Sequence, residues 1–287
     1  MGTLAIISFF LGLLLSFSEK KEVIKKCTNI YLVYFGLPFL ILVSLSAERY
    51  IQWWPFISAV MIFLICLNLV AYYLLKYINL EPKKKSALFL CGTYGNFAYL
   101  GIPAGFIFFG NLGVALSALA TIAGGLIHFS LGIYLSNSYV QGRFNSLKEM
   151  FKFPLLYGLI AALILSRYNI SFPKDIRTFA SIAIYLAIFL VGISLQFKKF
   201  EWSYIFGIFL KFLISPISAL IISYLIHLSC NYRNMLLLLS LTPPALVNTV
   251  ISINYKFDES LTAELTSVGT GLFVLGLFLL KYHSYLI

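Results

Sequence analysis

The sequence predicts an all-α polytopic membrane protein. Ten transmembrane helices form two inverted five-helix repeats, with the fourth and ninth helices broken and crossing. The composition and the positions of helix breakers predict this fold. Of the 287 residues, 61% are hydrophobic and 11% are charged, and the mean hydropathy is +0.94. Because soluble proteins carry about a quarter charged residues, this composition excludes a soluble enzyme, a disordered chain and a disulfide-rich secreted module.

Ten apolar segments are long enough to cross a bilayer, which takes about 20 residues per helix. Their apolar runs are continuous, so they are helices rather than the alternating strands of about 10 residues found in membrane barrels. We place them at Gly2–Ser18, Thr28–Ser46, Trp53–Leu75, Ser86–Gly110, Leu112–Ser136, Met150–Ser166, Arg177–Phe197, Ser203–Leu228, Met235–Tyr255 and Glu259–Lys281.

The distribution of basic residues sets the orientation. Of the 21 Lys and Arg, fourteen lie in loops after odd-numbered segments, six lie in the other loops or at the C-terminus, and Lys211 lies within a segment. Cytoplasmic loops are enriched in Lys and Arg, so both termini are predicted to be extracytoplasmic. The same rule explains the net charge of +11 without a nucleic-acid partner. We expect a multi-pass protein of the cell membrane, surrounded by lipid.

The ten segments divide into two sets of five, residues 1–140 and 141–287, joined by the polar stretch Asn137–Lys148. An odd number of helices per half means that the second half enters the membrane from the opposite side. The halves are then an inverted repeat, which is a common plan in transporters.

Helix breakers interrupt the fourth and ninth segments, which correspond in the two halves. The fourth contains Gly95, Gly101 and Pro103, and the ninth contains Pro243 and Pro244. A break frees backbone N–H and C=O groups that protein, water or substrate must satisfy. The N-terminus of a half-helix carries partial positive charge, which suits an anion. Paired breaks therefore predict a binding site near the membrane midplane.

Two asparagines lie at these breaks, Asn96 in the fourth segment and Asn248 in the ninth, where Thr249 follows. An amide side chain offers both a donor and an acceptor to a ligand. The alternative is a hydrogen bond between helices, worth about 0.6–2 kcal/mol. Because both amides lie beside matched breaks, we favour a ligand or ion site.

Three ionisable residues are further candidates. Lys211 lies about eight residues into the eighth segment, or about 12 Å deep. It either attracts a substrate carboxylate, pairs with a proton-linked acid or extends back to the interface. Glu264 and His128 are candidates for ion or proton coupling. The alternatives are placement at the interface for Glu264 and a hydrogen bond to a neighbouring helix for His128.

Signatures of enzymes are absent from the sequence. It has no H-E-x-x-H, no P-loop, no paired Asp-rich motif and no credible Ser/His/Asp set. The four cysteines form no C-x-x-C pair. We therefore predict no catalytic residues, no metal site and no cofactor.

The two broken segments carry the motifs GNFAYLGIPAGFIFFG (Gly95–Gly110) and PPALVNTVISINYKFDESLTAELTSVGTGLF (Pro243–Phe273). They resemble the fourth-span and the ninth- and tenth-span signatures of the auxin efflux carrier family. The similarity continues at Lys152-Phe153-Pro154, at Leu190–Leu195 and at Lys211 with Pro216, so that it covers nearly the whole chain.

The resemblance implies ten helices in inverted repeats, a fold shared with bile acid/sodium symporters. It also implies an elevator-like motion of a transport subdomain, which holds the crossed helices, against a scaffold subdomain. Known substrates of the family are small organic anions, namely auxin in plants and dicarboxylates in some bacteria. The stretch Asn137–Glu149 is short compared with the hydrophilic loop of many plant carriers, which favours a prokaryotic type.

We therefore expect a secondary transporter that moves a small organic anion, a carboxylate, by alternating access. Asn96 and Asn248 would bind the substrate together with the freed backbone around Gly95–Pro103 and Pro243–Thr249, and Lys211 would balance its charge. The oligomeric state is left open, with a homodimer as one alternative.

Two other functions stay open. A sodium-coupled symporter would be favoured by acidic residues deep in the membrane, where the sequence offers only the shallow Glu264. A membrane sensor that binds a ligand without moving it would often carry a soluble output domain, which this sequence does not show.

Overall fold

The computed structural model describes residues 2–47, 53–140, 164, 172–195 and 202–283, and most of them are helical. Within these ranges, every predicted segment except the sixth coincides with helix. The sixth, Met150–Ser166, lies outside the described residues apart from Ile164. The predicted boundary between the two halves lies at residue 140, which is the last described residue before the stretch 141–163.

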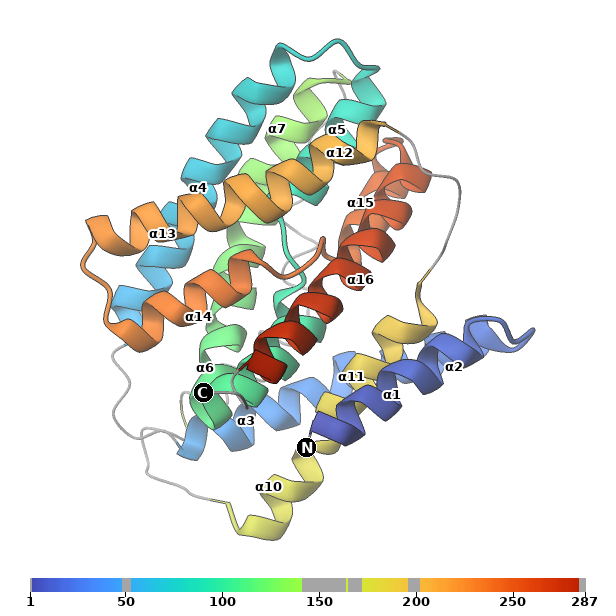
Figure 1. Ribbon diagram of the computed structural model, residues 1–287, viewed down its shortest axis with the longest axis vertical. Helices are drawn as coiled ribbons and strands as arrows, with labels where there is room; N and C mark the ends of the chain where they lie inside the picture. The colour runs from blue at the N-terminus through green and yellow to red at the C-terminus, as the bar shows by residue number, and fades with distance from the viewer. Residues whose placement is uncertain (1, 48–52, 141–163, 165–171, 196–201, 284–287) are drawn as a thin grey trace.

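A first group of helices lies together along one side of the molecule (Figure 1). It comprises α1 (Gly2–Leu15), α2 (Lys21–Tyr31), the π-helical η1 (Leu32–Gly36), α3 (Leu37–Ala47), α10 (Lys174–Ala180) and α11 (Ile182–Ile193). Helices α1 and α11 pack along each other, because glycines allow their backbones to approach. A Cβ on Gly192 would lie only 3.2 Å from the Cα of Gly12. Small residues at such contacts are typical of packed membrane helices.

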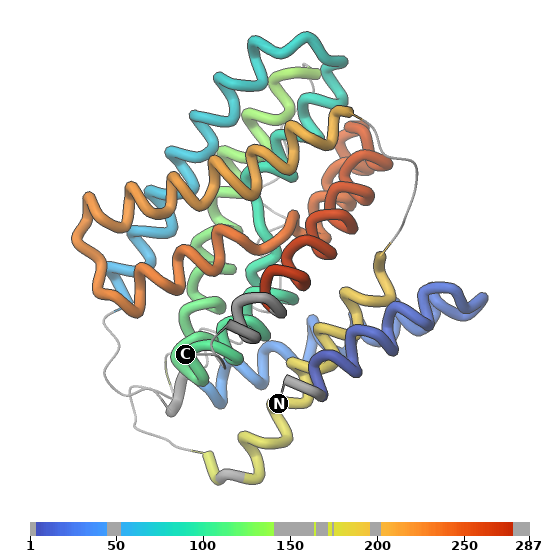
Figure 2. Tube along the Cα trace, in the orientation of Figure 1, coloured from blue at the N-terminus to red at the C-terminus, as the bar shows by residue number. Residues whose placement is uncertain are grey.

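A second group forms the rest of the described structure. It comprises α4 (Trp53–Lys76), α5 (Pro82–Thr93), η2 (Phe97–Gly101), α6 (Ile102–Ile127), η3 (His128–Gly132), α7 (Ile133–Ser138), α12 (Ser203–Phe209), η4 (Leu210–Ile214), α13 (Ser215–Leu225), α14 (Cys230–Ser240), α15 (Val247–Asn254) and α16 (Glu259–His283). Helices α13 and α14 run antiparallel and side by side (Figure 2). The two groups meet where α3 packs against α6 and α11 packs against η2.

The chain reverses direction at Gly110, between the fourth and fifth predicted segments. Gly110 has φ +59° and ψ −140°, which interrupts α6. A Cβ on Gly105 would lie 2.7 Å from the carbonyl oxygen of Gly113. Eight residues of straight helix would instead separate these positions by about 12 Å. The two segments are therefore distinct helices joined by a tight turn.

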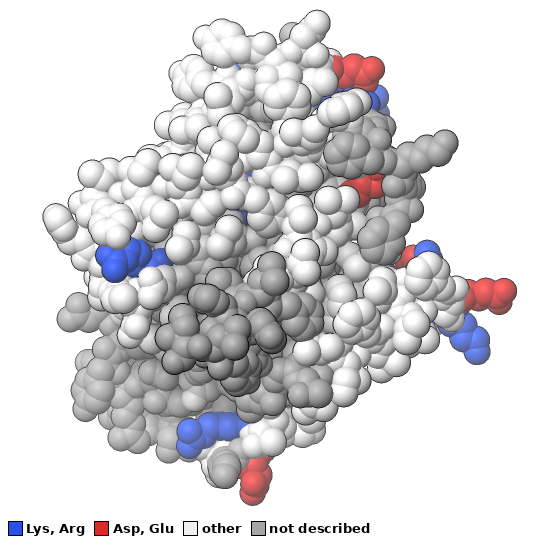
Figure 3. Space-filling model, viewed as in Figure 1, with Lys and Arg blue, Asp and Glu red and all other residues white. Residues whose placement is uncertain are grey.

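Within the described ranges, six helices are long and apolar enough to cross a membrane. They are Lys21–Ser44, Trp53–Lys76, Phe97–Ser138, Asp175–Ile193, Ser203–Leu225 and Glu259–Leu277. On the face shown in Figure 3, charged residues lie mainly at the edges of the molecule and leave a broad uncharged surface between them. Large hydrophobic side chains are exposed on several of these helices, which is expected where lipid is the solvent.

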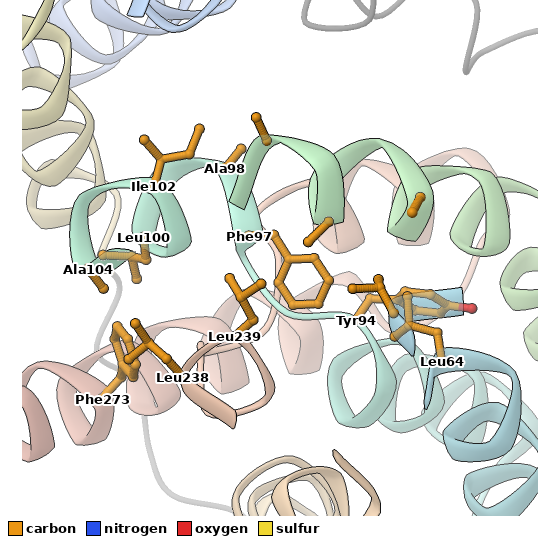
Figure 4. Packing of buried hydrophobic residues seen from close by; sticks show 14 of the residues in the cluster. Leu64, Tyr94, Phe97, Ala98, Leu100, Ile102, Ala104, Leu238, Leu239 and Phe273 are labelled. Atoms are coloured by element: carbon orange, nitrogen blue, oxygen red, sulfur yellow. The ribbon is translucent and has the colours of Figure 1, made fainter. Parts of the chain in front are cut away.

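The buried core surrounds the interruption of the fourth segment. The ring of Phe97 lies between Leu239 of α14 and the side chains of Tyr94 and Leu64 (Figure 4). All four residues are buried. This packing holds the irregular backbone between α5 and η2 inside the protein, where it is shielded from lipid.

Candidate substrate site at the crossing of two broken helices

The two interruptions meet in space. Helix α5 ends at Thr93 and α14 ends at Ser240, and their continuations η2 and α15 begin a few residues later. Gly95 and Pro244 form an isolated antiparallel β-bridge between the gaps. The backbone N–H of Asn96 donates to the carbonyl of Pro243 at 2.8 Å, and that of Ala245 donates to the carbonyl of Tyr94 at 3.0 Å. The predicted positions of both breaks, and their contact, are confirmed.

The residues at the breaks explain why the helices stop there. A Cβ on Gly95 would collide with Thr242 and would lie 2.9 Å from Nζ of Lys211, so only glycine fits. Pro243 and Pro244 lack an N–H and restrict the preceding backbone, so α14 cannot continue through them. The two breaks are therefore joined by backbone N–H and C=O groups that form no hydrogen bond within a helix.

The N-terminal ends of η2 and α15 face one cavity of about 980 Å³, a size suited to a small organic ligand. Asn96 caps η2, because its Oδ1 accepts a hydrogen bond from the N–H of Tyr99 at 3.0 Å. From the two breaks, the cavity is lined by Tyr94, Gly95, Asn96, Phe97, Ala98, Tyr99, Ala245, Leu246, Val247 and Thr249. Each N-terminus carries a partial positive charge of about half a unit, so the cavity favours negative charge.

Other elements complete the cavity wall. Helix α2 contributes Glu22, Lys25, Lys26 and Asn29, and α11 contributes Leu190, followed by Ser194 just after its end. Among the described lining residues, Glu22 is the carboxylic acid, and the basic side chains are Lys25, Lys26 and His128. The cavity thus lies between the two groups of helices, with charged residues of α2 on one wall.

The predicted site residues divide between the cavity and the crossing behind it. Gly95, Asn96, Thr249 and His128 line the cavity. Asn248 does not. Its side chain is fully buried, and its Nδ2 donates to the carbonyls of Leu90 at 3.1 Å and Tyr94 at 3.3 Å.

The remaining residues predicted from the breaks support the backbone. Gly101 packs against Leu239, and its carbonyl accepts a hydrogen bond from Oγ of Ser117 at 2.9 Å. Pro103 is buried in the first turn of α6. Pro243 and Pro244 lie opposite Gly95 and Asn96 at the crossing. These residues shape the site rather than line it.

Two ionisable candidates lie outside the cavity lining. Lys211 is buried beside Gly95. Glu264 is buried on α16, where one of its carboxylate oxygens accepts a hydrogen bond from Oγ of Ser260 at 2.8 Å. The structure therefore does not place either side chain against the space where a ligand would bind.

One cluster beside the crossing was not anticipated from the sequence. The hydroxyl of Tyr94 donates to Oδ1 of Asn68 at 2.8 Å, and its ring stacks on His128 with centroids 3.8 Å apart and planes 9° apart. The hydroxyl of Tyr99 also donates to Asn29 of α2 at 2.6 Å, which links the two groups of helices. Polar residues within apolar segments were the available signal, but their partners depend on how the helices pack.

Comparison with known proteins identifies the family. A family model described as membrane transport protein matches residues 3–143 and 139–281. The uncharacterized transporter MJ1031 of Methanocaldococcus jannaschii is 30% identical over 270 residues, which is 88% of each chain. The uncharacterized transporter YfdV of Escherichia coli is 27% identical over 161 residues, which is 52% of this chain and 51% of the relative.

The family model and the match to MJ1031 extend over nearly the whole chain and agree with the resemblance of the two broken segments. Together with the long apolar helices, they indicate an integral multi-pass membrane protein. The chain belongs to the membrane transport protein family, which is auxin efflux carrier-like, and is a membrane transporter.

Proposed function

We propose that this transporter moves a small organic anion with a carboxylate group, which binds in the cavity at the crossing. The observation that carries the proposal is that two half-helix N-termini, those of η2 and α15, open onto one cavity. Two ends of partial positive charge, placed in a low-dielectric membrane, attract an anion more strongly than they would in water.

The cavity lining supports a ligand that is polar at one end and apolar elsewhere. Near the breaks, the amide nitrogen of Asn96 and the hydroxyl of Thr249 can donate to a carboxylate. Ile122, Phe129 and Val250 offer apolar surface to the rest of the molecule. Asn248 acts from behind the cavity, because its amide nitrogen fixes the carbonyls of Leu90 and Tyr94.

The arrangement of helices suits an elevator-like mechanism. The group with α1, α2, α3, α10 and α11 would be the scaffold, and the group with the crossing would move against it. Leu190 and Ser194 belong to the first group, whereas Asn96 and Thr249 belong to the second, yet all four line the cavity. A bound substrate would therefore lie at the boundary along which the two groups slide.

The predicted topology indicates from which side of the membrane the cavity is reached in this conformation. Lys25 and Lys26 line the cavity from α2, in a stretch that the basic-residue distribution places on the cytoplasmic side. The structure would then be the inward-facing state, with its substrate site reached from the cytoplasm.

Counterflow in proteoliposomes tests the proposal. Purified protein would be reconstituted and assayed with labelled mono- and dicarboxylates, each paired with its uncharged amide as a matched control. We expect exchange of at least one carboxylate and of none of the amides. Asn96→Ala should weaken the apparent affinity about tenfold, whereas the exposed Asn234→Ala should not change it. Equal exchange of a carboxylate and its amide would contradict the proposal.

A further inference from the structure

His128 is an ionisable residue of the cavity wall that the proposed binding of a carboxylate does not use. It is the first residue of η3, it lines the cavity, and its exposed fraction is 5%. Its Nε2 is buried and has no hydrogen-bond partner among the described residues. A buried polar atom without a partner is costly and calls for an explanation. The hydrogen bond to a neighbouring helix, which the sequence offered as the alternative role, is therefore not formed at this nitrogen.

The ring of His128 is held beside the crossing by Tyr94. The two rings stack with centroids 3.8 Å apart and planes 9° apart. The hydroxyl of Tyr94 donates to Oδ1 of Asn68 at 2.8 Å, and its carbonyl accepts from the N–H of Ala245 at 3.0 Å. Since a cation over the face of a tyrosine ring is attracted to it, this position also suits an imidazolium. Tyr94 therefore joins the ring of His128 to the backbone of the crossing.

The elements packed around this ring carry little charge. Among the described residues, no carboxylate or ammonium group interacts with it electrostatically. Helices α6 and α7, which pack on η3, contain no Asp, Glu, Lys or Arg. Helix α4 also packs on η3, and its charged residue is Lys76, about 12 Å along the helix from Asn68. A charge placed in the cavity would therefore meet little competition at His128.

Tyr94 is the titratable side chain that faces His128. On α5 the three lysines lie in the first turn, and Tyr94 follows the last residue of the helix. Tyr72 of α4 contacts the ring of Tyr139, with centroids 5.3 Å apart, and Tyr134 of α7 is 59% exposed. The charged residues of the cavity wall lie on α2 and are Glu22, Lys25 and Lys26.

A carboxylate bound in the cavity would change the charge that favours one form of His128. An ordinary imidazole changes its charge between about pH 5 and 8, and a carboxylate nearby favours the protonated form. We propose that His128 takes up one proton when a carboxylate binds, so that the anion and the proton cross the membrane together. The inference rests on the proposed function.

The proton comes from the solution on the side where the substrate enters. A neutral imidazole has one ring nitrogen without a hydrogen, and the new N–H bond forms there. The same N–H bond breaks when the substrate leaves on the other side, and the proton returns to water. Because η3 belongs to the group of helices that would move, the proton travels with the substrate.

The first test counts protons on the wild-type protein. The probe is the carboxylate that exchanges fastest in the counterflow panel, and its binding would be followed by titration calorimetry in two buffers with different ionisation enthalpies. We expect uptake of close to one proton per bound carboxylate near neutral pH. Binding without proton uptake would overturn the inference and leave the proposed function intact. Failure to exchange any carboxylate would instead overturn the proposed function.

The second test asks whether His128 holds that proton. Because the complex has one more proton than the free protein, the affinity of wild type for the same carboxylate should rise about tenfold as the pH falls from 8 to 7. His128→Gln keeps a polar side chain that does not titrate, so its affinity should not change with pH. The matched control is His227→Asn, because His227 is exposed and asparagine tolerates its φ of +51°. This control should keep the wild-type slope, and a folded His128→Gln protein that also keeps it would overturn the inference.

The third test measures proton movement during transport and needs no variant. Wild-type proteoliposomes would hold a pH-sensitive dye, and an inward gradient of the labelled carboxylate would be imposed. The lumen should acidify by about one proton per carboxylate that enters. Protein-free liposomes under the same gradient correct for passive entry of the undissociated acid. Accumulation of the carboxylate with no more acidification than in these liposomes would overturn the inference, whether or not the glutamine variant folds.

Discussion

Asn96 donates its backbone N–H to the carbonyl of Pro243 at 2.8 Å, and this bond joins two helix breaks that lie in different halves of the sequence. The second bond, from Ala245 to Tyr94, completes the pair. Because the breaks satisfy each other, irregular backbone persists inside an apolar protein at low cost. The N-terminal ends of η2 and α15 stay directed at the cavity, and the C-terminal ends of α5 and α14 lie beside Lys211.

Gly95→Ala should disrupt the crossing. The new methyl group would collide with Thr242 and crowd Lys211, and overpacking of this kind costs about 1–3 kcal/mol. We expect a lower melting temperature and loss of transport. The matched control is Gly271→Ala on α16, where a Cβ would meet no atom within 4 Å. If both variants melt and transport alike, the close approach at Gly95 is not needed.

The breaks could be predicted from sequence because proline and glycine act on the backbone directly. Pro243 has no backbone N–H and cannot donate a hydrogen bond wherever it lies. Gly95 has no Cβ, and this also is a property of the residue itself that the sequence shows. The partners of Asn248 could not be predicted, because the carbonyls of Leu90 and Tyr94 reach it only after two distant segments cross. Residue spacing placed these amides near the breaks but did not reveal that Asn96 lines the cavity and Asn248 does not.

The position of Lys211 shows the same limit. Hydropathy predicts its depth in the membrane, but not which residues it lies beside, since that depends on how η4 packs against α5. The stacking of Tyr94 on His128 likewise requires η3 to lie beside the break. Local sequence patterns therefore predict where a membrane helix is interrupted, while the side chains that meet at the resulting site depend on tertiary contacts.

Asn248→Ala should destabilise the protein more than it weakens substrate binding. The change removes two hydrogen bonds to buried carbonyls that hold the crossing, and an unsatisfied buried polar group costs about 1–3 kcal/mol. Thermal unfolding in detergent and substrate affinity would be measured on the same preparation. An unchanged melting temperature combined with weakened affinity would show that Asn248 contacts the substrate directly.

Labelling of single cysteines tests the predicted orientation. In a cysteine-free background, Lys84→Cys should react with an impermeant maleimide only after the cytoplasmic face is opened, whereas Arg233→Cys should react in intact cells. The expectation comes from the excess of Lys and Arg in the odd-numbered loops. Labelling of position 84 from outside would reverse the topology and the direction assigned to the cavity.

The most direct test of the central claim is protection of the cavity by substrate. Thr249 lines the cavity beside the N-terminus of α15, so Thr249→Cys in a cysteine-free background should react with a small maleimide. A carboxylate substrate at about ten times its Kd should slow this reaction about tenfold, because it then occupies about nine-tenths of the sites, and its amide analogue should not. Tyr77→Cys, at an 82% exposed position, should react at the same rate throughout. Equal labelling of Thr249→Cys with and without a carboxylate that the protein transports would contradict a substrate site at the crossing.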